Sequence, residues 1–283
     1  MTKTLDAARP AAPLLVGRAT RRGGSRRTSW FKPSYWLPTV AALAVAAGLW
    51  SWVAKDNPYI LPTLGSVGEA LANDPGFFVR NAWVTLQEAL IGLAIGFVAA
   101  FIVGIAVAEW PVARRAIMPL AVVLNVTPVV AIAPALVVAF GFGPMPKLIV
   151  TALITFFPVL MNVTTGLRSV SQPILQVFRT LDASRLEVLW RLRIPSALPY
   201  VFAALRVVFP LSIVGAVVAE FSAPGAAAGL GTVISVASSN AQLPVVFAAI
   251  ACLALMGSLL LLVITTVERR VLSWHESQQV SAP

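Results

Sequence analysis

Long apolar runs separated by short polar segments make up most of the chain. They cover residues 37–54, 89–108, 116–142, 148–167, 200–221 and 243–267. Each is long enough for a transmembrane helix, which needs about 17–25 residues to cross a hydrocarbon core roughly 30 Å thick. A lone segment in a bilayer satisfies its backbone hydrogen bonds only as a helix. The pattern therefore predicts an all-α, polytopic membrane protein with six transmembrane helices.

The polar segment between the fourth and fifth runs, residues 168–199, has a helical pattern of its own. Pro173 stands where a first-turn proline is tolerated. The apolar residues that follow fall on one helical face: Ile174, Leu175, Val177, Phe178 and Leu181. We expect this helix to stop at Asp182, because aspartate is one of the few residues that visit the left-handed conformation needed for a bend.

A second short helix is predicted to begin after Ser184. Ser184 and Glu187 match a capping box, in which the serine hydroxyl accepts from the Glu187 amide and the glutamate reaches back. Glu187 can also pair with Arg191, four residues on. Pro195 marks the expected end of the helix. The apolar face of this helix consists of Leu186, Leu189 and Trp190.

Two amphipathic helices between membrane spans need a surface against which to place their apolar faces. Four arginines, Arg179, Arg185, Arg191 and Arg193, would suit a hairpin that lies among lipid headgroups. An exposed apolar face equally suits docking to another protein. The residues alone leave both interpretations open.

Composition supports the membrane assignment and predicts an orientation. The chain is 58% hydrophobic and 11% charged, against about 25% charged residues in soluble domains. Its net charge is +10, from 21 basic and 11 acidic residues. The basic residues lie mainly at the ends of apolar runs, where they orient a membrane protein, so we expect no nucleic-acid partner. They predict a cytoplasmic N-terminus, C-terminus and 168–199 segment.

The division into segments follows from these runs. Residues 1–36 are predicted to be a basic cytoplasmic tail that contacts anionic membrane lipid. Residues 37–80 hold the first transmembrane helix and an external segment, residues 81–270 a five-helix core, and residues 271–283 a C-terminal tail. A basic start before an apolar run also fits a cleaved signal peptide, but the run 37–54 is lengthy for one.

Small and proline residues predict how the spans pack. Gly92, Gly96 and Gly104 are spaced to flatten one face of the second span for close helix contact. Pro128 and Pro134 predict a kink in the third span, because each proline leaves a backbone carbonyl without its helical partner. A packed kink is the simpler interpretation, and a kink that lines a solute path is the functional one.

Three polar residues at membrane depth are candidates for the solute path: Asn125, Asn162 and Glu220. An ionisable group within a span is a functional hypothesis by default. Arg206 and Glu220 lie near the ends of the fifth run, however, where reaching to the interface is an alternative. The Gly/Ala/Ser-rich segment 222–242 after Glu220 is predicted to form a gate at the outer mouth.

Several chemistries have no residues to support them. The sequence has no G-x-x-x-x-G-K-[ST] motif and therefore no P-loop for ATP. The single cysteine, Cys252, excludes an internal disulfide. With only one histidine as well, His275, the sequence predicts no metal site. No nucleophile–base pair suggests a catalytic residue. An ion-coupled carrier remains an alternative function, although Glu88 and Glu220 are few carboxylates for ion coupling. A membrane scaffold is a second alternative function.

Residues 176–195 resemble the EAA loop of bacterial ABC-importer permeases, whose pattern is E-A-A, three residues, G, nine residues and I-x-L-P. Gln176-Val177-Phe178 stand at the first positions, Asp182 at the glycine, and Leu192-Arg193-Ile194-Pro195 at the end. The spacing is kept, while the glutamate and the glycine are replaced. Residues 128–147, 156–162 and 215–221 resemble permeases of the nitrate/sulfonate/taurine group, which includes thiamine-precursor and riboflavin importers. The resemblance extends from about residue 61 to residue 270.

The resemblance implies a type I ABC importer-like permease in a bacterial cytoplasmic membrane. Its partners would be two cytoplasmic ATPase subunits, a second permease copy in a homodimer, and an extracytoplasmic solute-binding protein. The chain itself would bind no cofactor, since ATP and Mg would lie on the ATPase. The implied ATPase contacts are Phe178, Arg179, Leu181, Asp182, Ala183 and Ser184. The favoured solute is a thiamine-type pyrimidine precursor or related heterocycle, and the alternative is a sulfonate, taurine or nitrate.

Overall fold

The computed structural model describes residues 33–56, 59–222 and 228–272, and all regular structure within them is helical. The basic tail predicted for residues 1–36 lies mostly outside the described residues, as does the C-terminal tail. The described residues fall into two units that divide between Leu49 and Trp50. The helices are α1 (Pro33–Asp56), α2 (Leu64–Asn73), α3 (Pro75–Glu109), α4 (Pro111–Val126), α5 (Val129–Phe140), α6 (Pro144–Leu167), α7 (Gln172–Thr180), α8 (Arg185–Val188), η2 (Leu189–Arg193), α9 (Ile194–Ser222), α10 (Leu230–Ser239) and α11 (Leu243–Val271).

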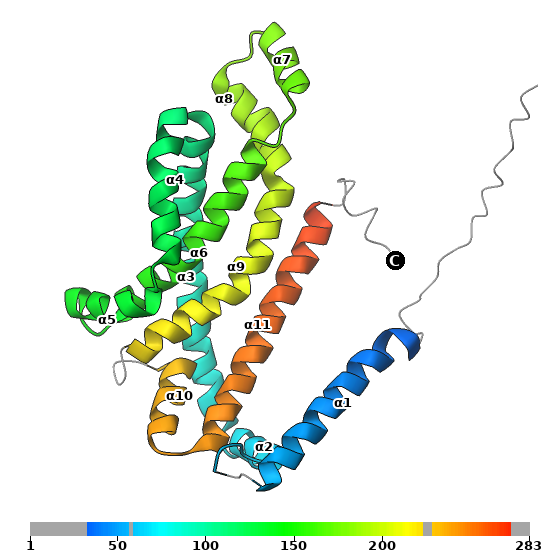
Figure 1. The fold of residues 1–283 in the computed structure, drawn as a ribbon, viewed down its shortest axis with the longest axis vertical. Helices are drawn as coiled ribbons and strands as arrows, with labels where there is room; N and C mark the ends of the chain where they lie inside the picture. Colours follow the sequence, from blue (N-terminus) through cyan, green and yellow to red (C-terminus); the bar gives the residue numbers. More distant parts are fainter. Residues whose placement is uncertain (1–32, 57–58, 223–227, 273–283) are drawn as a thin grey trace, which may run out of the picture. The chain divides into compact units, whose positions relative to one another are not determined.

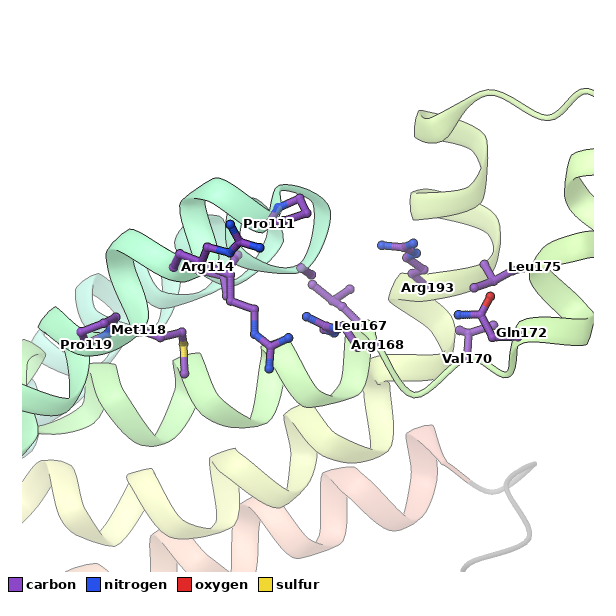
Figure 2. Close-up of a pocket in the computed structure, with 13 residues that line it drawn as sticks. Pro111, Arg114, Met118, Pro119, Leu167, Arg168, Val170, Gln172, Leu175 and Arg193 are labelled. Atoms are coloured by element: carbon purple, nitrogen blue, oxygen red, sulfur yellow. The ribbon is translucent and has the colours of Figure 1, made fainter.

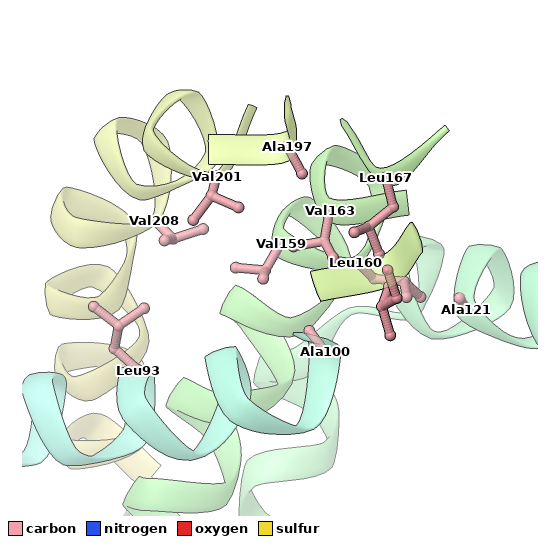
Figure 3. Close-up of a cluster of buried hydrophobic side chains, with 11 residues drawn as sticks. Leu93, Ala100, Ala121, Val159, Leu160, Val163, Leu167, Ala197, Val201 and Val208 are labelled. Carbon is pink, nitrogen blue, oxygen red and sulfur yellow. The ribbon is translucent and has the colours of Figure 1, made fainter. Parts of the chain in front are cut away.

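Three long helices, α3, α6 and α9, form the centre of the second unit (Figure 1). Figure 3 shows a core of small and β-branched side chains between them, including Ala100, Val159, Val163 and Val208. The predicted glycine face is confirmed, since a Cβ at Gly96 would lie 2.5 Å from Thr155 Oγ1. Only hydrogen fits at such positions, so α3 and α6 approach closely along this face.

A second apolar cluster holds α2, α3, α10 and α11 together. Its buried members include Phe78, Leu230, Ala249 and Met256. The segment after the first predicted span contains the short helix α2, and the Gly/Ala/Ser-rich segment 222–242 contains the short apolar helix α10. This cluster lies at the opposite end of the unit from α7 (Figure 1).

The third predicted span, residues 116–142, is not one continuous helix. It is broken at Thr127 and Pro128, and the axes of α4 and α5 differ by 95°. Pro128 has no amide hydrogen to continue the ladder, and the residue before a proline is driven out of the helical conformation. Thr127 accordingly has ψ 126°, and its hydroxyl donates to the Val123 carbonyl.

Three predicted boundaries are also corrected. α3 begins at Pro75, capped by Asp74, and is much longer than the predicted 89–108 run. α6 begins at Pro144, four residues before the predicted run 148–167. The helix after Ser184 does not end at Pro195. It widens into the π-helical turn η2, in which the Ile194 amide donates to the Leu189 carbonyl, and then continues as α9. The wider turn lets the helix pass the proline.

The number of spans agrees with the sequence prediction. Five helices are long and apolar enough to cross a membrane, and the bent pair α4–α5 makes a sixth if it counts as one span. These helices expose large apolar side chains such as Leu43, Ile102 and Leu262 along their outer faces. Apolar surfaces of this extent are favourable in contact with lipid and unfavourable in contact with water.

Candidate functional site

A bent pair of short helices, α7 and α8, projects from one end of the bundle (Figure 1). We call residues 172–190, from α7 to the start of η2, the elbow. Asp182 has φ 50°, so it adopts the left-handed conformation predicted for it. The Asp182 and Ala183 amides donate back to the Arg179 and Phe178 carbonyls, which closes the end of α7. An aspartate therefore makes the turn that the related motif makes with glycine.

The start of α8 is fixed by the predicted capping box, which is confirmed. The Glu187 amide donates to Ser184 Oγ at 3.2 Å, and the Ser184 amide donates to Glu187 Oε2 at 2.9 Å. The serine hydroxyl donates to the same carboxylate oxygen at 2.9 Å. These bonds satisfy amides that a helix start would otherwise leave without partners.

The elbow presents an apolar face that nothing within the described residues covers. Leu181, Leu186 and Trp190 are 71%, 64% and 62% exposed. Of the residues predicted to contact an ATPase, Arg179, Leu181, Asp182 and Ser184 are exposed, and Phe178 and Ala183 are partly buried. All six lie at one bend, and their contact with an ATPase stays a prediction.

The base of the elbow is joined firmly to the bundle. Leu189 in η2 is buried in the same core cluster as Leu167 and Ala197. Arg193 pairs with Glu109 at the end of α3, with 2.5 Å between Nη1 and Oε1. A force on the elbow would therefore reach α3, α6 and α9 through packed side chains and one ion pair.

The opposite end of the unit contains a second polar constellation, around Glu220. This carboxylate is fully buried and accepts from Thr85 Oγ1 at 2.7 Å. It also accepts from the Gly231 amide at 2.5 Å and the Thr232 amide at 3.2 Å, at the start of α10. A carboxylate is stabilised there by free amides and by the helix dipole. Glu220 thus ties α10 to α9 and α3.

Two further side chains of α3 form hydrogen bonds to the start of α10. Asn81 Oδ1 accepts from the Gly229 amide at 2.9 Å, and Thr85 Oγ1 accepts from the Leu230 amide at 2.8 Å. Asn81, Thr85 and Glu88 lie on one face of α3, because they are spaced four and three residues apart. Sequence reasoning missed the first two, although their polar spacing at the start of an apolar helix was a visible signal.

A buried ion pair lies beside Glu220. Lys147 Nζ and Glu88 Oε1 are 2.7 Å apart, and both side chains are almost closed to solvent. Lys147 lies outside the predicted membrane spans, between the runs 116–142 and 148–167, yet the structure buries it, since the side chain is only 1% exposed. Ionisable groups within a bundle generally pair with one another, so the positions of Glu88 and Lys147 immediately before the apolar runs 89–108 and 148–167 held the signal.

The other two predicted solute-path residues lie apart from Glu220. Asn125 is exposed near the end of α4. Asn162 is partly buried in α6, and its Nδ2 donates to the Pro158 carbonyl at 2.8 Å. Arg206, for which the sequence favoured reaching to the interface, pairs with Glu268 of α11 at 3.0 Å. The solute-path role of these residues stays a prediction.

Nothing in the described ranges suggests a metal site, since no three His, Cys, Asp or Glu side chains gather there. The described residues thus hold an exposed bend at one end and a carboxylate-capped helix at the other, joined by α3, α6 and α9.

Comparison with known families agrees with this geometry. Residues 92–273 match the model of the family described as the binding-protein-dependent transport system inner membrane component. The chain belongs to this family. The resemblance inferred from the 176–195 motif is therefore confirmed, and the chain is an importer permease of the type that lacks its own ATPase site.

The curated relatives of this chain are also transport permeases. The chain is 33% identical to the formylaminopyrimidine transport permease ThiX of Halalkalibacterium halodurans, over 78% of this chain and 88% of ThiX. It is 32% identical to the taurine transport permease TauC of Escherichia coli, over 90% of this chain and 96% of TauC. Among solved structures, it is similar to an inward-facing MetNI methionine ABC transporter chain, with a TM-score of 0.62, 15% identity, and coverage of 70% and 98%. That likeness shows a shared fold.

Proposed function

We propose that this permease couples ATP hydrolysis on partner subunits to solute import by docking its elbow into them. The observation that carries the proposal is the uncovered apolar face of Leu181, Leu186 and Trp190, held at a capped bend. Two ATPase subunits would bind ATP and Mg and grip the elbows of two permease copies in a homodimer. Only a difference in contact between two ATPase states is needed to drive the bundle between conformations.

The mechanism assigned to the chain is alternating access. Closure of the ATPase pair would move the elbow, and its buried base would pass the displacement to α3, α6 and α9. At the far end, α10 would follow α9 because Glu220 binds its amides. An extracytoplasmic solute-binding protein would deliver the solute there, on the path assigned to Asn125, Asn162 and Glu220.

Co-purification tests the docking step. Ala183→Glu places a bulky charge in the bend and should reduce the amount of ATPase that co-purifies by about tenfold, since an unpaired buried charge disrupts an interface. Gly68→Glu is the matched control, because Gly68 is exposed in α2 with no heavy atom within 4 Å of a new Cβ. Equal ATPase recovery for wild type and Ala183→Glu would contradict the proposal.

Orientation is tested by labelling intact cells. In a Cys252→Ala background, Arg185→Cys should react with a membrane-permeant thiol reagent and resist an impermeant one. Gly68→Cys, in the segment predicted to be external, is the control that should react with both. Impermeant labelling at position 185 would place the elbow outside and rule out an intracellular ATPase as its partner.

For the solute, we favour a thiamine-type pyrimidine precursor or related heterocycle. Similarity to the formylaminopyrimidine permease supports this choice, and similarity to the taurine permease over more of the chain supports a sulfonate as the second candidate. Uptake by reconstituted vesicles with the cognate binding protein would separate the two. ATP-independent uptake driven by an ion gradient would instead indicate a secondary carrier.

A further inference from the structure

A hollow of about 570 Å³ lies at the elbow end of the bundle, between α4, the end of α6, the segment leading into α7, and η2 (Figure 2). Arginines from three of these segments line it: Arg114, Arg115, Arg168 and Arg193. Apolar side chains such as Met118 and Leu167 form the rest of the wall. The hollow therefore combines a strongly basic rim with an apolar floor.

Only one of the four guanidinium groups is neutralised within the part of the chain that the structure describes. Arg193 pairs with Glu109. No carboxylate there lies within 4 Å of Arg114, Arg115 or Arg168. Three positive charges around one hollow repel each other unless an anion joins them, and the planar guanidinium fork fits phosphate oxygens in a bidentate manner.

A second hollow continues from the first towards the middle of the bundle. It holds about 350 Å³ and shares Arg114, Met118 and Arg168 with the first, then extends along α6 to Met161. Seven helical residues separate Met161 from Arg168, which is roughly 10 Å along the axis. The buried hydroxyl of Thr164 lines this part and has no hydrogen-bond partner among the described residues.

We propose that the two hollows form a binding site for one anionic phospholipid. The headgroup phosphate lies among Arg114, Arg115 and Arg168, and the glycerol ester region and one acyl chain follow α6 past Thr164 and Met161. A free phosphate ion would use only the basic rim. The apolar continuation along a membrane-spanning helix favours a lipid, since acyl chains bind where apolar surface adjoins basic side chains at a bilayer boundary.

Lipid binding to the full chain tests this site. The permease is purified from membranes with any subunits that accompany it, stripped of lipid, and titrated in native mass spectrometry with dioleoyl phosphatidylglycerol or dioleoyl phosphatidylcholine. Wild type should bind phosphatidylglycerol about tenfold more tightly than phosphatidylcholine. Arg114→Gln/Arg168→Gln should reduce that affinity roughly 25-fold, at about fivefold for each arginine near a headgroup. The matched control is Arg269→Gln/Arg270→Gln, which removes two exposed arginines at the end of α11 and should leave the affinity unchanged.

A second variant separates lipid from free anion and does not alter the charge. Thr165→Trp should block the inner hollow and weaken phosphatidylglycerol binding, while glycerol 1-phosphate and inorganic phosphate should fail to displace the lipid from wild type. Equal affinity for the two lipids, equal losses in the test and control arginine pairs, or displacement by either soluble phosphate would overturn the proposal. Size-exclusion profiles establish that each variant is folded.

Discussion

Lys147 Nζ lies 2.7 Å from Glu88 Oε1, in a pair with side-chain exposures of only 1% and 10%. Lys147 lies in the first turn of α6 and Glu88 lies well inside α3, so the pair fastens the start of α6 to the side of this parallel helix. It lies beside the bonds through which Glu220 and Thr85 hold α10. This end of the bundle is therefore fastened by buried polar contacts in addition to its apolar cluster, whereas the middle of the bundle is fastened by small apolar residues.

Breaking the ion pair on one side should destabilise the fold more than removing it entirely. Lys147→Met leaves the Glu88 carboxylate buried without its cation, and we expect a loss of about 3–5 kcal/mol in the free energy of unfolding. Lys147→Met/Glu88→Leu should recover most of that loss. Thermal unfolding in detergent provides the measurement, and a double variant as unstable as the single one would contradict this reading.

Gly229 should not tolerate a side chain. Its φ of 151° is unfavourable for other residues, and a Cβ there would lie 2.4 Å from Glu220 Cδ. Gly229→Ala should therefore displace the carboxylate from the start of α10 and destabilise the protein by about 2 kcal/mol or more. Gly143→Ala, where a Cβ meets no heavy atom within 4 Å, should change the melting temperature little.

The contact between α3 and α6 depends on Gly96. A Cβ there would lie 2.5 Å from Thr155 Oγ1 and 2.6 Å from the Ala152 carbonyl oxygen. Gly96→Ala should force the helices apart and cost about 1–3 kcal/mol. Gly257→Ala in α11 is the control, because its nearest new contact is an ordinary 3.7 Å. Comparable melting temperatures for the two variants would count against close α3–α6 packing.

The elbow should accept glycine but not a β-branched residue at position 182. Asp182 has φ 50°, a region that costs most side chains about 1–2 kcal/mol and glycine nothing. Asp182→Gly should leave tryptic cleavage at Arg179 and Arg185 unchanged or slower. Asp182→Ile should accelerate it by loosening the bend. Thr180→Ile, at the end of α7 with ordinary helical geometry, tests whether any β-branched residue in the elbow has the same effect.

Much of the local structure follows from the sequence because it depends on neighbouring residues. The capping box of Ser184 and Glu187 and the left-handed turn at Asp182 involve residues within one or two turns of each other. Span number follows from apolar run length, because the bilayer thickness fixes how many residues a helix needs. The glycine face of α3 is readable for the same reason, since its spacing is that of a single helix.

Contacts between distant segments could not be located from the sequence. Pro195 predicts a helix end, but packing of Leu189 in the core and a π-helical turn carry the helix past it. Lys147 lies outside the predicted run 148–167, and only the parallel register of α3 and α6 brings Glu88 to it. Glu220 was identified as important, yet its partners come from residues 135 and 11 positions away.

The sequence by itself determined the membrane class, the helical periodicity and the bend of the elbow, because bilayer thickness and short-range hydrogen bonds act on local patterns. Only the tertiary structure decided which charges are paired and which remain free. A buried carboxylate needs partners in three dimensions, and those partners lie on separate helices. The same holds for the basic hollow, whose arginines meet only after α4, α6 and η2 have packed together.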